Sequence, residues 1–117
     1  MTRPVRARDI CSFVRIVIGM NMDIEIKRVY EPASKDDGYR VLVDRLWPRG
    51  MKKEEAKFDL WLREVAPSNS LRKWYGHDPE RWEEFKKRYA RELEDKKELV
   101  EQIESKAKDE KVTLLFS

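Results

Sequence analysis

The sequence predicts a single α/β domain over residues 22 to 117, with a small, mainly parallel sheet flanked by helices. Two continuous apolar runs, at residues 41–43 and 112–116, have the composition of strands buried on both faces. Segments with helical spacing of apolar residues lie between these runs, and parallel strands need such crossover connections. The length of 117 residues suits one domain with one core of moderate size.

Residues 1 to 21 are interpreted as an N-terminal extension that the core fold does not require. A disordered tail, an added strand, and a helix packed on the domain or on a partner all remain open for this segment. Its apolar run at residues 10–20 contains Arg15 and is shorter than the roughly 20 residues that span a bilayer. Neither a membrane span nor a signal peptide is therefore predicted.

The first half of the domain predicts two strands separated by a loop. Partial alternation at residues 24–29 indicates a strand, and the Pro, Ser, Asp and Gly residues of 30–38 indicate a loop that ends in a turn. The central strand is expected over residues 39–44. Pro48 and Gly50 then end the sheet pairing and turn the chain.

The second half predicts mainly helices. A helix is expected over residues 52–65, because four apolar side chains share one helical face: Phe58, Trp61, Leu62 and Val65. A short helical stretch over 68–75 should end at Gly76. Asp78 and Pro79 form a helix start, and Asp95 is expected to cap the helix that follows. The run at 112–116 is then placed parallel to the strand at 39–44.

Composition limits the classes of function. Charged residues make up 42% of the chain, and the net charge is +3. Residues 1 to 22 alone carry four arginines and one aspartate, so this excess gives little support to nucleic-acid binding without excluding it. Abundant Lys and Glu with one cysteine fit a heat-adapted protein. A single Cys and a single His form no disulfide or conventional zinc site, so a cytoplasmic protein without metal or cofactor is expected.

The loop after the central strand is the predicted ligand site, because ligands of open α/β sheets gather at the carboxyl ends of strands. Its candidate residues are Asp44, Arg45, Trp47, Arg49 and Gly50. In one interpretation the two guanidinium groups grip an anion, Trp47 walls the site, and Asp44 orients an arginine. In the other, the arginines pair with carboxylates while Trp47 packs into the core.

His77 is the candidate catalytic residue, since its ordinary pKa lies near neutrality. The same residue precedes the N-cap Asp78 and could instead pack on Trp82 as a hydrophobic staple. Lys73, Trp74 and Tyr75 could line the same cleft, although the spacing of Trp74 is typical of a core residue. Cys11 has no nearby base in the sequence, so it is not proposed as a nucleophile.

The sequence over residues 24 to 116 resembles the YeaO-like family of small uncharacterised proteins. The resemblance rests on ordered blocks, among them DGYRVLVDRLWPRG at residues 37–50, DLWL at 59–62, LRKWYGHDPERW at 71–82 and VTLL at 112–115. It implies no established reaction. Members of that family usually continue past the last strand with an acidic, His-bearing segment, so the C-terminal end is expected to be truncated relative to the family.

Three hypotheses for function follow. The first is binding of a small anionic, phosphate-bearing ligand at the loop after the central strand, with or without turnover. The second is a nucleic-acid-binding module that uses Arg, Lys and Trp side chains on one face. The third is a protein-interaction subunit or homo-oligomer, in which a partner covers apolar surface.

Overall fold

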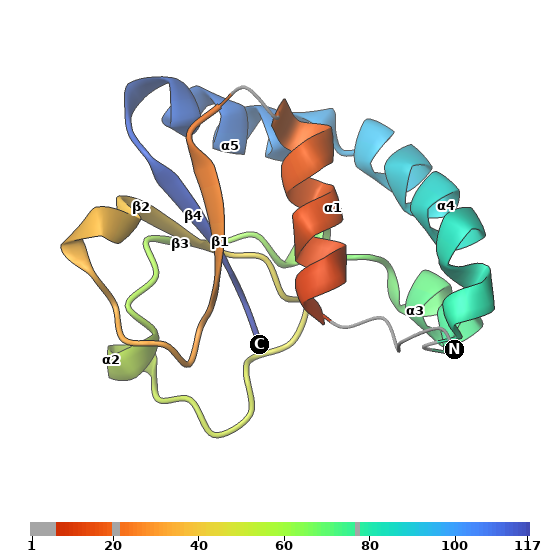
Figure 1. Cartoon of the computed structure of the whole chain (residues 1–117), viewed down its shortest axis with the longest axis horizontal. Helices are drawn as coiled ribbons and strands as arrows, with labels where there is room; N and C mark the ends of the chain where they lie inside the picture. Colours follow the sequence, from red (N-terminus) through yellow and green to blue (C-terminus); the bar gives the residue numbers. More distant parts are fainter. Residues whose placement is uncertain (1–6, 20–21, 77) are drawn as a thin grey trace.

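The computed structural model describes residues 7–19, 22–76 and 78–117 and contains a four-stranded sheet. The strand order is β1-β4-β2-β3, formed by Ile24–Arg28, Val112–Phe116, Tyr39–Leu42 and Leu60–Trp61. All three pairings are parallel, and Figure 1 shows the helices on one side of this sheet except for the short helix α2 (Lys53–Ala56), which lies apart from them. The predicted α/β fold is therefore confirmed, including the parallel pairing of the two apolar strands.

Strand β4 lies between two neighbours and is buried along its whole length. Val112, Leu114 and Phe116 belong to the larger of two apolar cores, and Leu115 belongs to the smaller one. This alternation follows from the period of two in a strand, whose successive side chains point to opposite faces. Both faces of the sheet are therefore covered.

The larger core lies between the sheet and the helices α1 (Ala7–Gly19), α3 (Asn69–Tyr75), α4 (Trp82–Glu94) and α5 (Lys97–Asp109). Cys11, Val14 and Ile18 of α1 are buried in it. The helical part of the N-terminal segment thus packs directly on the sheet. None of the helices in the described ranges is long and apolar enough to cross a bilayer.

The prediction of one helix over residues 52–65 is wrong. In its place the chain forms the four-residue helix α2 (Lys53–Ala56), strand β3 and a 3-10 turn η2 (Arg63–Val65). Lys57 ends α2 in the left-handed region at φ 46°, and the Asp59 N–H then donates to the Arg40 carbonyl. Pairing with β3 satisfies backbone N–H and C=O groups at the edge of β2. A helix over these residues would have left those groups of β2 without a strand partner.

The predicted ends of the other helices are mostly confirmed. The Ser68 hydroxyl accepts the Leu71 N–H at the start of α3, and Gly76 ends that helix at φ 55°. Asp78 caps the 3-10 turn η3 (Pro79–Arg81) that leads into α4. The prediction for Asp95 is wrong, since Asp95 closes α4 and α5 starts without a side-chain cap.

A buried polar network holds the sheet face opposite the long helices. Asp37, at the end of the 3-10 turn η1 (Lys35–Asp37), forms an ion pair with Arg40, and both residues are buried. The Arg40 guanidinium also donates to the carbonyls of Ala56 (2.8 Å) and Lys57 (2.7 Å). Burial would raise the pKa of Asp37, but hydrogen bonds from Ser34, Lys27 and Arg40 hold it below its ordinary value.

Replacing Asp37 with asparagine should lower the free energy of unfolding by about 3 kcal/mol or more, because a buried guanidinium loses its counter-charge. A carboxyl with a lowered pKa stabilises the fold above its unfolded value near 3.8 and loses that effect as the pH falls through the folded value. The difference from wild type should therefore shrink on acidification. Urea unfolding at several pH values measures this, with the exposed Asp36→Asn as control.

Alanine at Gly38 and at Gly50 should have unequal costs. Both glycines have positive φ, 65° and 76°, and in the left-handed helical region this costs an alanine about 1–2 kcal/mol; Gly38, with ψ −133°, lies outside that region in a conformation that favours glycine more strongly. At Gly38 an added Cβ would also collide with the Lys111 carbonyl oxygen, whereas at Gly50 it would meet nothing within 4 Å. Thermal unfolding should show a clearly larger loss for Gly38→Ala, and equal losses would contradict the close approach.

Candidate functional site

The carboxyl ends of the four parallel strands lie at one edge of the sheet. Figure 1 places the long loop after β2 at this edge, near the C-terminal end of the chain. The five predicted ligand-binding residues, 44, 45, 47, 49 and 50, lie in this loop. These five residues, however, lie in different surroundings.

Arg45 is bonded to the protein itself. Its guanidinium donates to the carbonyls of Pro67 (3.0 Å) and Ala66 (3.1 Å) and lies 3.4 Å from a Glu64 carboxylate oxygen. Its side chain is only 15% exposed. These contacts tie the loop after β2 to the segment before α3, so they favour a structural role for this arginine.

Trp47 and Arg49 lie elsewhere in the loop. The Trp47 ring packs edge-on against Phe58 and Trp61, and its indole N–H donates to the Met51 carbonyl (2.7 Å). The Arg49 side chain is exposed, and its backbone carbonyl accepts the Tyr30 hydroxyl (2.9 Å). The hydrogen bonds of Arg45 and of Arg49 therefore go to different parts of the chain.

Gly50 makes the turn in this loop. The Met51 N–H donates to the Pro48 carbonyl (3.2 Å), and Gly50 has a positive φ at the third position of that turn. Since α2 starts only at Lys53, the Met51 N–H is part of this turn rather than a free donor at a helix start.

Asp44 faces the C-terminal edge rather than either loop arginine. One carboxylate oxygen accepts the Ser117 N–H (2.8 Å). Burial raises the pKa of Asp44, against the bonds from Ser117 and the positive charge of Arg72. The arginine whose charge acts on Asp44 is therefore Arg72.

Of the two reactive side chains considered above, the structure describes only Cys11. His77 lies outside the described residues. Cys11 is 2% exposed in the core, and burial, followed by the charge of Asp44, raises the pKa of its thiol far above the ordinary value. A thiol with a raised pKa is a poor nucleophile, as the sequence predicted.

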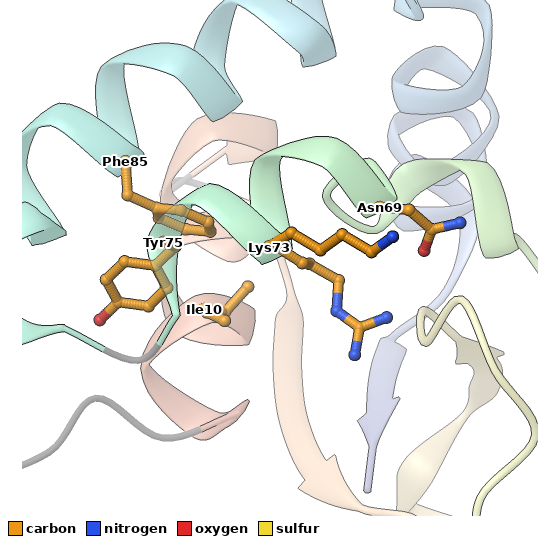
Figure 2. Close-up of a pocket in the computed structure, with 6 residues that line it drawn as sticks. Ile10, Asn69, Lys73, Tyr75 and Phe85 are labelled. Carbon is orange, nitrogen blue, oxygen red and sulfur yellow. The ribbon is translucent and has the colours of Figure 1, made fainter.

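A pocket of about 230 Å³ lies between α1, α3 and α4. Its polar lining consists of Asn69, Arg72 and Lys73, and its apolar lining of Ile10, Tyr75 and Phe85. Figure 2 shows the Tyr75 and Phe85 rings beside Ile10 at one end, with the polar ends of Lys73 and Asn69 at the other. The pocket is therefore amphipathic along its length.

Sequence analysis did not predict this pocket. It proposed Lys73, Trp74 and Tyr75 for the cleft at the loop after the central strand; Lys73 and Tyr75 line the pocket between the helices, and Asn69 and Arg72 were not proposed. Positions 69, 72 and 73 are separated by three and four residues, so they share one face of a helix, and this signal was present in the sequence. Ile10 could not be found, because its position depends on how α1 packs against the sheet.

Comparison with known proteins places the chain among uncharacterised relatives. A family model described as "Inactive DUF488-N3 subclade" matches residues 23–117. An uncharacterised protein of Mycobacterium tuberculosis is 50% identical over 67% of this chain and 66% of its own length. The uncharacterised protein YeaO of Escherichia coli is 43% identical over 82% of this chain and 84% of its own length.

The chain belongs to this YeaO-like subclade. The matched region spans just under two thirds of the mycobacterial relative. No solved structure matches the YeaO-like chain. Because these relatives are themselves uncharacterised, membership establishes the family and leaves the function unknown.

Truncation of Arg45 to alanine should lower the free energy of unfolding by about 2 kcal/mol, because two carbonyl oxygens lose a charged donor. Arg45→Lys should recover only part of the loss, since an ammonium cannot fork between two acceptors. The free energy of unfolding of the matched variant Arg49→Ala should lie within about 0.5 kcal/mol of the wild-type value, because that side chain is exposed. Urea titrations measure all three, and a stable Arg45→Ala would contradict the structural role.

Proposed function

We propose that this YeaO-like protein binds a small amphipathic anion in the pocket between α1, α3 and α4. The ligand would combine an apolar or aromatic body with a phosphate or carboxylate group. The observation that carries the proposal is the pairing of two cationic side chains, Arg72 and Lys73, with an apolar wall in one pocket.

The two cationic side chains of this pocket can contact a ligand, although the charge of Arg72 also acts on Asp44. Arg72 and Lys73 are exposed, and neither takes part in any ion pair recorded among the described residues. A guanidinium and an ammonium suit an anionic group, and the Asn69 amide can add a further hydrogen bond. This arrangement supports an anion site at α3 rather than one in the loop after β2, where Arg45 already donates to backbone carbonyls.

The apolar lining supports an organic ligand rather than a bare inorganic ion. Tyr75 and Phe85 are both buried, with ring centroids 4.6 Å apart. Burial, together with the charges of Asp9 and Asp78, raises the pKa of Tyr75, so its phenol is neutral at physiological pH. Since both rings are almost fully buried, an aromatic ligand body would gain contact area mainly against the partly exposed Ile10, which these rings support.

Binding without turnover is the form of the proposal that the comparisons support. The matching family model describes its subclade as inactive. The single buried cysteine further supports a reducing, cytoplasmic setting for the protein.

Isothermal titration with phenyl phosphate, inorganic phosphate and phenol tests the proposal. Phenyl phosphate should bind most tightly, because it alone offers both a ring and a charge. Arg72→Ala and Lys73→Ala should each weaken its binding about tenfold, since a charged hydrogen bond contributes about 1.5–3 kcal/mol. Phenyl phosphate recovered after incubation should be intact.

Two further variants locate the ligand. Lys87→Ala removes an exposed cation from α4 and should leave the affinity unchanged. Arg49→Ala should also have no effect, and a loss of binding in that variant alone would move the anion to the loop after β2. Unchanged binding in both Arg72→Ala and Lys73→Ala would reject the pocket.

A further inference from the structure

A second surface lies at the carboxyl ends of β1, β2 and β3. It combines three aromatic residues with three arginines: Tyr30, Trp47, Trp61, Arg28, Arg49 and Arg63, here called the basic-aromatic edge. Five large apolar side chains are exposed in the described part of the chain, and three of them, Tyr30, Leu46 and Trp47, lie on these loops. Such a concentration marks a contact surface.

Two rings of the basic-aromatic edge, Trp47 and Trp61, are in direct contact. The Trp47 and Trp61 ring centroids lie 5.5 Å apart in an edge-on arrangement. Indole N–H groups anchor both rings, since Trp47 donates to the Met51 carbonyl and Trp61 to the Asp44 carbonyl, each at 2.7 Å. The Tyr30 hydroxyl donates to the backbone carbonyl of Arg49, which ties the Tyr30 loop to the segment that carries Trp47. These rings are therefore held in place before any partner arrives.

The arginines lie over or beside the rings. The Arg63 guanidinium carbon lies 4.0 Å from the Trp61 ring centroid, and that of Arg28 lies 5.3 Å from the Tyr30 ring. A guanidinium stacked on a ring keeps its outer face and its edge donors for another group. None of the ion pairs recorded among the described residues includes Arg28, Arg49 or Arg63.

Most carboxylates on the same loops already have partners. Asp59 accepts the Arg40 N–H, Asp44 accepts the Ser117 N–H, and Glu64 pairs with Arg45. Glu31 accepts the backbone N–H of Arg28. Glu54 and Glu55 on α2 are the remaining carboxylates of this region in the described part of the chain. Bonds from backbone N–H groups leave the carboxylate charges in place, so the case for an anionic partner rests on the exposed guanidinium groups of Arg28 and Arg63, which lie on the rings.

We propose that the basic-aromatic edge binds single-stranded nucleic acid. Bases stack on aromatic rings and on guanidinium planes, while arginine side chains contact the phosphates. A duplex hides its base faces, so it could use only the charges of this surface. The proposal is independent of the pocket between α1, α3 and α4, because it uses none of the residues that line it.

Fluorescence anisotropy with a labelled oligothymidylate of about 12 nucleotides tests the proposal, with an oligouridylate and a duplex of equal length as further arms. Single strands should bind more tightly than the duplex, with affinity falling as salt rises. An abasic oligomer of the same length should bind at least about tenfold more weakly, because it keeps the phosphates and loses the stacking. The DNA and RNA arms show which sugar is preferred.

Charge variants map the surface without removing the packed rings. Arg49→Gln and Arg63→Gln should each weaken binding and reduce the slope of log affinity against log salt by about 0.7, as expected for one lost phosphate contact on a single strand. Arg91→Gln, at an exposed position on α4, is the matched control and should change neither.

Three outcomes would overturn the proposal. They are no binding of any single strand at low salt, equal affinity for the abasic oligomer, and an Arg91→Gln effect as large as that of Arg63→Gln. Circular dichroism of each variant establishes that a loss of binding is not a loss of fold.

Discussion

The structure depends on the burial of strand β4 between two parallel neighbours. All five of its side chains are buried, and its backbone pairs with β1 on one side and β2 on the other. A parallel strand in this position needs cover on both faces, because no polar face remains to meet water. The helices satisfy this need on one face, and a short helix with its loops satisfies it on the other.

The unequal cover of the two faces explains where polar and aromatic residues gather. The helical side is a broad apolar core, whereas the other core has four buried members in the described part of the chain: Val29, Leu42, Ala56 and Leu115. On this thinner side the Asp37–Arg40 ion pair closes one end of the sheet, and the rings of Phe58 and Trp61 cover the other. Large aromatic rings are an efficient cover for a sheet that no long helix reaches.

The arginines illustrate how burial decides the role of a charged side chain. The guanidinium groups of Arg40 and Arg45 donate to carboxylates and backbone carbonyls. These bonds hold loops to the sheet and one loop to another. Arg72 and Arg63 have the same chemistry, yet their guanidinium groups border a pocket and a ring respectively. An arginine without an internal acceptor is available for ligands, whereas one that bonds buried carbonyls is part of the fold.

The sequence by itself determined the α/β class, the parallel pairing of the two apolar strands, the end of α3 and the start of the turn before α4. These features follow from local patterns: continuous apolar runs, an aspartate cap, and glycine where φ is positive. Only the tertiary structure decided that Leu60 and Trp61 form a strand and that Arg45 is bonded internally. It also placed Ile10 beside Phe85 in one pocket. Those outcomes depend on which backbone groups and surfaces lack a partner after the sheet has formed, and such contacts between distant residues leave no periodic trace in the chain.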